Sequence, residues 1–277
     1  TRSKAKTVFV LGGGGNLGAI QVGMLRAALE RGIRPDVVVG CSVGAINAAA
    51  LAADPTPEGA RQLQEAWLGV HNDMLCPSSR LSSVRLLTRK ARSLTANDGL
   101  RNLLRQWLPY HLLEEAAIPV EVVATDLRTG KEHWFATGSV DEAVLASAAL
   151  PAVFPPVVID GTPYIDGGVV NNVPISRAVE LGATRVVVMH VGNFERPRPE
   201  PRRPIDVLLQ SFSIARNHRF LAEVGSTPEG VEMIVLPGID PGRLRYNDFS
   251  RSRMLMERAY ATSSAFLDAS HLVVAGA

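Results

Sequence analysis

The sequence has little cysteine, little net charge and no long apolar run. Only 2 of its 277 residues are Cys, too few for a disulfide framework, so we expect a reducing compartment. Lys and Arg number 29 against 27 Asp and Glu, and so small an excess argues against nucleic-acid binding. No stretch reaches the roughly 18 apolar residues of a membrane span. These absences predict a cytoplasmic protein that is at most peripheral to a membrane.

Metal-binding motifs are also missing. The chain has no H-E-x-x-H, no C-x-x-C and no EF-hand loop, so we predict neither a metal nor a cofactor. Hydrophobic residues make up 46% of the chain and charged residues 20%, which is enough apolar material for a sizeable core. No linker clearly separates two parts, and we therefore predict a single domain over 1–277.

Hydrophobic periodicity predicts alternating strands and helices in the first third of the chain. This alternation favours an α/β fold with a mostly parallel sheet and helices on both faces. We expect strands at 7–12, 36–40, 119–127, 131–138, 185–192 and 231–237, the third and fourth forming a hairpin. We expect helices at 17–32, 44–53, 140–149, 205–224 and 251–269, and mainly helix over 57–115.

Four consecutive glycines in "VFVLGGGGNLGA" raise the question of what needs so much bare backbone before a helix. Gly13, Gly15 and Gly18 fit G-x-G-x-x-G, the dinucleotide fingerprint. That site also needs an acidic residue at the end of the second strand, whereas Asp36 begins it. A phosphate-binding P-loop would need Lys and Ser or Thr after the glycines. The glycines fit better as donors to an oxyanion formed during acyl transfer.

The second strand leads into "GCSVG", a match to the G-x-S-x-G nucleophile elbow. Ser42 would stand at the N-terminus of a helix, with Gly40 and Gly44 leaving room for a sharp turn. Two residues could serve as its base. His190 lies near the end of a predicted strand, and Asp166 precedes two glycines, Gly167 and Gly168, in "PYIDGGVVNNVP". The same Asp-Gly pair also fits an ordinary turn.

Three blocks together resemble the patatin-like phospholipases, which use a Ser–Asp dyad. These are "GGGGNLGA", "GCSVGAINAA" and "ASAALPAVFPPVVIDGTPYIDGGVVNNVP", within about 7–192, leaving 193–277 as a C-terminal part without a motif. The resemblance implies a three-layer α/β fold and hydrolysis of lipid acyl esters, of phospholipase A or lysophospholipase type. It assigns Ser42 as nucleophile and Asp166 as general base, with the oxyanion bound by the amides of Gly13, Gly14 and Gly15.

One position departs from the family pattern. The family's loop usually carries Arg or Lys where this chain has Leu17, so a nearby positive charge is lost or comes from elsewhere. Two alternatives stay open: a soluble esterase or thioesterase with a Ser42–His190 pair, and a lipid-binding protein without catalysis.

Two further expectations concern the dyad and the membrane. An ordinary Asp has a pKa near 3.9 and is a weak base. We therefore expect Asp166 to be buried, which raises its pKa, and to lie within hydrogen-bond reach of Ser42. Residues 79–94 combine an apolar helical face with five basic residues, and such a segment can contact an anionic lipid surface.

Overall fold

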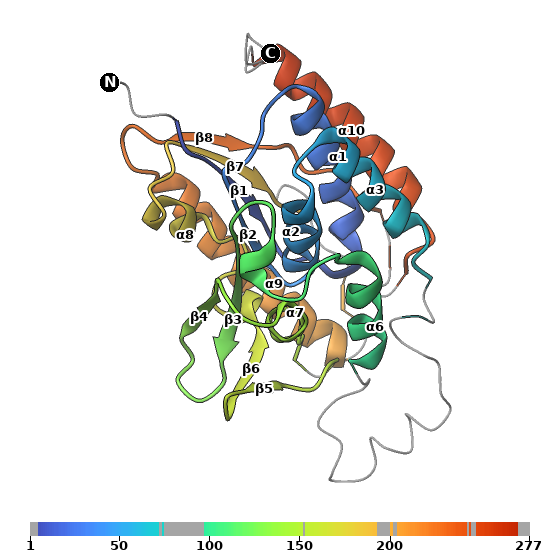
Figure 1. The fold of residues 1–277 in the computed structure, drawn as a ribbon, viewed down its shortest axis with the longest axis vertical. Coiled ribbons are helices and arrows are strands. Elements are labelled where there is room, and N and C mark those ends of the chain that lie inside the picture. The colour runs from blue at the N-terminus through green and yellow to red at the C-terminus, as the bar shows by residue number, and fades with distance from the viewer. Residues whose placement is uncertain are drawn as a thin grey trace.

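The structure is a computed structural model that describes residues 5–71, 74, 97–151, 153–192, 200–201, 204–242, 244 and 248–270. The possible membrane-contact segment 79–94 lies outside these residues. An eight-stranded sheet runs through the centre in the order β5-β6-β3-β2-β1-β7-β8, with β4 also paired to β3 (Figure 1). The strands are β1 (Thr7–Leu11), β2 (Val37–Cys41), β3 (Val120–Asp126), β4 (Glu132–Phe135), β5 (Val157–Ile159), β6 (Thr162–Asp166), β7 (Arg185–Met189) and β8 (Glu232–Val235).

The sheet is mostly parallel, as predicted. Strands β3, β2, β1, β7 and β8 run parallel, while β4, β5 and β6 are antiparallel additions at one side. The helices are α1 (Gly18–Glu30), α2 (Val43–Ala53), α3 (Pro57–Leu68), α6 (Asp98–Trp107), α7 (Val140–Ser147), α8 (Ile175–Glu180), α9 (Pro204–Gly225) and α10 (Ser252–Ala269).

Helices cover both faces of the sheet, because residues of the central strands alternate between two apolar cores. Phe9 and Leu11 of β1 belong to the larger core, under α1, α2, α3, α6, α7 and α10. Val8 and Val10 belong to a smaller core with residues of α8 and α9. Successive side chains of a strand point to opposite faces. The result is the three-layer α/β arrangement expected from the sequence (Figure 1).

The carboxyl ends of adjacent parallel strands gather the candidate site residues at one edge. The glycine loop follows β1, Ser42 follows β2, and Val191 lies just after β7. Asp166 reaches this edge through the strand register. Cys41 of β2 pairs with Val123 of β3, and the next residue of β3, Ala124, pairs with Asp166. Because β4 occupies the other edge of β3, the carboxyl ends of β2 and β6 meet end to end along one edge of that strand.

Most expected elements are present, with ends that differ by a few residues. The sequence analysis missed the β5–β6 hairpin and the short helix α8. Both fall in the block from 146 to 174 or just after it, where Pro and Gly interrupt any regular periodicity. No helix in the described part of the chain is both long enough and apolar enough to cross a bilayer.

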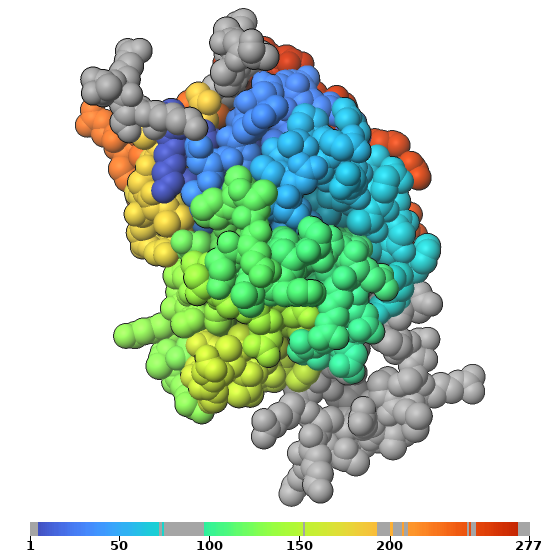
Figure 2. All heavy atoms as spheres, in the orientation of Figure 1, coloured from blue at the N-terminus to red at the C-terminus, as the bar shows by residue number. Residues whose placement is uncertain are grey.

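The first and last helices pack closely together. Tyr260 of α10 donates its hydroxyl to Glu30 Oε2 of α1 at 2.6 Å, and Arg31 binds both carboxylate oxygens of Asp268 at 2.7 Å. Figure 2 shows the N-terminal (blue to cyan) and middle (green to yellow) parts in direct contact on one face. We propose that these parts and the C-terminal helix form one folding unit.

Replacing Gly23 tests this packing. A Cβ atom at Gly23 would lie 2.2 Å from Met256 O of α10, so Gly23→Ala should push the two helices apart. We expect a loss of about 1–3 kcal/mol in the free energy of unfolding, measured by denaturant titration. Gly69→Ala is the matched control, since the nearest atom to its Cβ among the described residues would be Ala66 O at 3.4 Å. Equal stability of both variants would contradict the close contact.

Candidate active site

Ser42 occupies a strained turn between β2 and α2. Its φ of 54° and ψ of −124° are unusual for a residue with a side chain. The turn passes so close to β1 that a Cβ at Gly44 would lie 2.1 Å from Leu11 O. The backbone amide of Ser42 donates to Ser147 Oγ at 2.9 Å. This is the crowded strand-to-helix turn expected from the G-x-S-x-G match.

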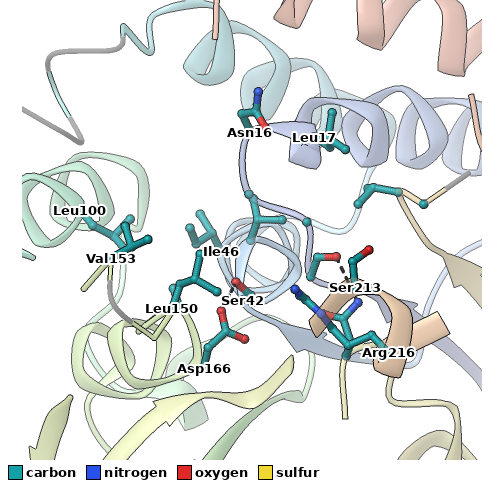
Figure 3. Close-up of a pocket in the computed structure, with 18 of the residues that line it drawn as sticks. Asn16, Leu17, Ser42, Ile46, Leu100, Leu150, Val153, Asp166, Ser213 and Arg216 are labelled. Atoms are coloured by element: carbon teal, nitrogen blue, oxygen red, sulfur yellow. Dashed lines mark hydrogen bonds between the residues drawn. The ribbon is translucent and has the colours of Figure 1, made fainter. Parts of the chain in front are cut away.

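Asp166 faces Ser42 directly (Figure 3). The Ser42 hydroxyl donates to Asp166 Oδ2 at 2.7 Å, and the Gly168 amide donates to Oδ1 at the same distance. Only 2% of Asp166 is exposed. The expected burial and hydrogen-bond reach are both confirmed. The two residues come from blocks more than a hundred positions apart.

Burial has the largest effect on the pKa of Asp166. Desolvation raises the pKa of its carboxyl above the ordinary value, against the opposing effects of the Arg216 charge and of hydrogen bonds from Ser42 and Gly168. A higher pKa makes the carboxylate a stronger base towards a hydroxyl. The neighbouring Cys41 thiol is fully buried, and desolvation together with the Asp166 charge raises its pKa as well.

The glycine loop differs in one detail from the expectation. The Gly13 amide donates to the backbone oxygen of Asn172 at 3.0 Å, and Asn172 Nδ2 donates back to Gly13 O at 3.2 Å. Gly13 is therefore held by the segment after Asp166, and its amide is already engaged. Within the described residues, the amides of Gly14 and Gly15 donate to no protein acceptor. Both glycines line the cavity beside Ser42.

A buried polar network holds the ends of this loop, and the sequence analysis missed it. Gln21 Nε2 donates to Gly12 O at 2.6 Å, and Asn47 Nδ2 donates to Gly18 O at 3.1 Å. Asn47 also joins Gln21 to Trp67, whose indole donates to Asn47 Oδ1 at 2.8 Å. Gln21 and Asn47 are fully buried polar residues on apolar helix faces, which is the signal that identifies them in the sequence.

His190 does not accept the hydrogen bond of the Ser42 hydroxyl in this structure. The Ser42 hydroxyl donates to a carboxylate, while the His190 ring packs against Phe220 with 5.0 Å between ring centroids. Burial lowers the pKa of His190 to about 4, so its imidazole is neutral near pH 7.

Ser42 and Asp166 open onto a cavity of about 330 Å³ with mostly apolar walls. Leu17 is one of the residues that line this cavity (Figure 3). Asp166 is the one acidic and Arg216 the one basic residue among the described residues that line it. The apolar lining consists of Leu17, Val43, Ile46, Trp67, Val70, Leu100, Leu103, Trp107, Ala148, Leu150, Val153, Phe154, Val173, Val191, Phe220 and Phe249. No group of three or more His, Cys, Asp or Glu in the described ranges is arranged to hold a metal.

The family model described as Patatin-like phospholipase matches residues 9–179, more than half of the chain. The chain belongs to the patatin-like phospholipase family. The match includes the glycine loop, Ser42 and Asp166, and it ends before α9.

Two relatives illustrate how far the similarity extends. Patatin-like phospholipase domain-containing protein 7 of Rattus norvegicus is 31% identical over 187 residues, which are 67% of this chain and 13% of that protein. An uncharacterized NTE family protein of Mycobacterium tuberculosis is 29% identical over 193 residues, which are 70% of this chain and 51% of that protein. This patatin-like chain therefore spans only a minor part of the first relative and about half of the second.

Solved structures of similar shape include two bacterial proteins. VipD from Legionella pneumophila is 15% identical, with a TM-score of 0.48 over 96% of this chain and 67% of that chain. ExoU from the type III secretion system of Pseudomonas aeruginosa, solved with SpcU, is 16% identical, with a TM-score of 0.44 over 97% of this chain and 53% of that chain.

The raised pKa of Asp166 predicts a dependence of stability on pH. Asp166→Asn removes the desolvated charge, while the amide can still accept from Gly168 and donate to Ser42. The folded pKa of Asp166 lies above its unfolded value, so wild-type stability falls as pH rises from near 3.9 through the folded pKa. At pH 7 we expect the variant to melt higher, by about 2–4 °C for each kcal/mol of relieved desolvation.

The measurement is a series of thermal melts of both proteins between pH 4 and pH 7. The gain of the variant should shrink as the pH falls, because the buried wild-type carboxyl takes up its proton more readily in the folded than in the unfolded state. A variant that melts lower than the wild type at every pH would contradict the desolvation argument.

Proposed function

We propose that the protein is a serine hydrolase that cleaves carboxylic esters of lipids, with Ser42 as nucleophile and Asp166 as general base. The observation that carries the proposal is the 2.7 Å hydrogen bond from Ser42 Oγ to a buried carboxylate at the wall of an apolar cavity. A hydroxyl nucleophile is activated when it donates a hydrogen bond to a general base.

The first step forms an acyl-enzyme. Ser42 Oγ attacks the ester carbonyl carbon while its proton passes to Asp166 Oδ2. The carbonyl oxygen becomes an oxyanion, which the amides of Gly14 and Gly15 are placed to bind. One such preorganised donor can be worth about 10²–10³ in rate. The tetrahedral intermediate collapses, the C–O bond to the alcohol breaks, and Asp166 returns the proton to the leaving oxygen.

The second step releases the acid. A water molecule gives a proton to Asp166 and attacks the acyl carbon, forming a second oxyanion in the same place. Collapse breaks the bond to Ser42 Oγ, which takes the proton back from Asp166. The cycle leaves a fatty acid and an alcohol, with both side chains in their starting states.

The cavity walls favour a substrate with a long apolar acyl group. Trp67, Leu103 and Trp107 extend the cavity away from Ser42 towards α6, and Leu17 adds to the same apolar surface. Burying an acyl chain there contributes about 0.8 kcal/mol for each CH₂. Family membership supports a lipid ester, and activity of phospholipase A or lysophospholipase type is part of the proposal.

Removing either member of the dyad should abolish hydrolysis. We expect Ser42→Ala to lose labelling by a fluorophosphonate probe and all measurable turnover of a lysophospholipid. Asp166→Asn should lower kcat by about 10²–10⁴-fold, because the serine loses its base. Initial rates and gel fluorescence measure both effects, and far-UV circular dichroism checks that the variants fold. Absence of labelling and turnover in the wild type would favour a lipid-binding protein without catalysis.

His190→Gln separates the Ser–Asp dyad from a Ser–His pair. The substitution keeps a polar side chain beside Phe220 and removes the imidazole. We expect kcat within about threefold of the wild type, since losing a true general base costs about 10²–10⁴-fold. Rates are normalised to folded protein from a thermal melt. A loss as large as that of Asp166→Asn would assign the base to His190.

A further inference from the structure

Arg216 brings a positive charge into the site from a part of the chain beyond the family match. One face of α9 lines the cavity through Ser213, Arg216, Asn217 and Phe220, which recur at helical spacing. Figure 3 shows the guanidinium of Arg216 pointing towards Ser42. A Cβ at Gly168 would lie 2.9 Å from Asp166 Oδ1 and 3.3 Å from Arg216 Nη1. Carboxylate and guanidinium thus flank the same glycine.

Within the described part of the chain, Arg216 makes two hydrogen bonds. Nε donates to Phe212 O at 3.3 Å and Nη1 donates to Asn172 Oδ1 at 3.1 Å. A guanidinium has five N–H donors. Among the described residues no carboxylate forms an ion pair with Arg216, whereas Arg219, one turn further along α9, pairs with both Glu132 and Glu223. Arg219 thus stabilises the fold through its ion pairs, whereas Arg216 lines the cavity.

The position of Arg216 matches the charge that the glycine loop lacks. Asn172 accepts from Arg216 and donates to Gly13 O, so one side chain joins the guanidinium to the loop. The loop itself presents Leu17 to the cavity. The cavity therefore has an apolar side, formed with Leu17, and a cationic side, formed by α9.

We propose that Arg216 binds the phosphate group of a glycerophospholipid or lysophospholipid substrate. This inference rests on the proposed function, because it places the ester carbonyl at Ser42. In these lipids only glycerol carbons separate the ester from the phosphate, so both ends can be held at once. Arg favours phosphate through paired N–H donors in a planar fork. The acyl chain then occupies the apolar side of the cavity.

The test compares two substrates that share one acyl chain and one ester. Lysophosphatidylcholine and monoacylglycerol, both oleoyl, are presented in mixed micelles of the same neutral detergent, on the pH plateau of activity. We expect Arg216→Gln to lower kcat/KM for lysophosphatidylcholine by about 10–100-fold, the value of hydrogen bonds to a charged group. The same variant should lower kcat/KM for monooleoylglycerol by a smaller factor, because there Arg216 acts only through the pKa of Asp166, which its charge lowers.

Matched variants distinguish the effect of the Arg216 guanidinium from effects of net charge or of folding. Arg61→Gln removes one exposed positive charge from α3 and should leave kcat/KM unchanged for both substrates. Arg216→Lys keeps the charge without the fork, and we expect it to retain part of the selectivity. Inorganic phosphate, added against a chloride control of equal ionic strength, should not inhibit monooleoylglycerol hydrolysis selectively in the wild type.

Three results would overturn the inference. Equal losses on both substrates would make Arg216 a structural or electrostatic residue, and unchanged rates on both would remove it from the site. Selective inhibition by inorganic phosphate, with lipid selectivity unaffected in Arg216→Gln, would indicate a site for free phosphate. Failure of the proposed function is distinguishable, because wild type and Ser42→Ala would then be equally inactive on both lipids.

Discussion

The hydrogen bond between Ser42 and Asp166 is the interaction around which the site is built. It forms because β2 and β6 pair with successive residues along the same edge of β3, while β4 occupies the other edge. In this register Cys41 pairs with Val123 and Asp166 with the next residue, Ala124. A shift of one residue in the β3–β6 pairing would turn the carboxylate of Asp166 to the opposite face of the sheet. The antiparallel β5–β6 hairpin thus serves to deliver one side chain.

The same interaction is costly to the fold. Burying a carboxylate raises its pKa, and the backbone of Ser42 is strained at positive φ. Both features suit a nucleophile and its base, because they leave the carboxylate poorly solvated and the hydroxyl fixed in place. The surrounding scaffold offsets the cost through two apolar cores and the network of Gln21, Asn47 and Trp67. The fold therefore tolerates a local loss of stability at this edge of the sheet, and the two side chains are held in a fixed geometry there.

Sequence reasoning reached the fold class and most elements because each left a local pattern, while the pairing of Ser42 with Asp166 came from the resemblance to the patatin-like family. Periodicity marks buried strands and helices, and G-x-S-x-G marks a sharp turn. Contacts between distant segments left no such pattern. The engagement of the Gly13 amide depends on where Asn172 lies, and Arg216 sits on a helix whose sequence reads as an ordinary amphipathic surface. Only the packing of α9 against the site reveals which of its residues face inward.

The site divides its electrostatic work between backbone and side chain. In the proposed mechanism the backbone amides of Gly14 and Gly15, which line the cavity, bind the transient negative oxygen, and they carry no net charge. The guanidinium of Arg216 stands on the other side of Asn172 and also lowers the pKa of Asp166 against the effect of burial. A cation closer to the loop, at the position of Leu17, would occupy wall that now contacts apolar groups. An arginine on α9 leaves that wall apolar, and its charge opposes the rise in the pKa of Asp166 that burial causes.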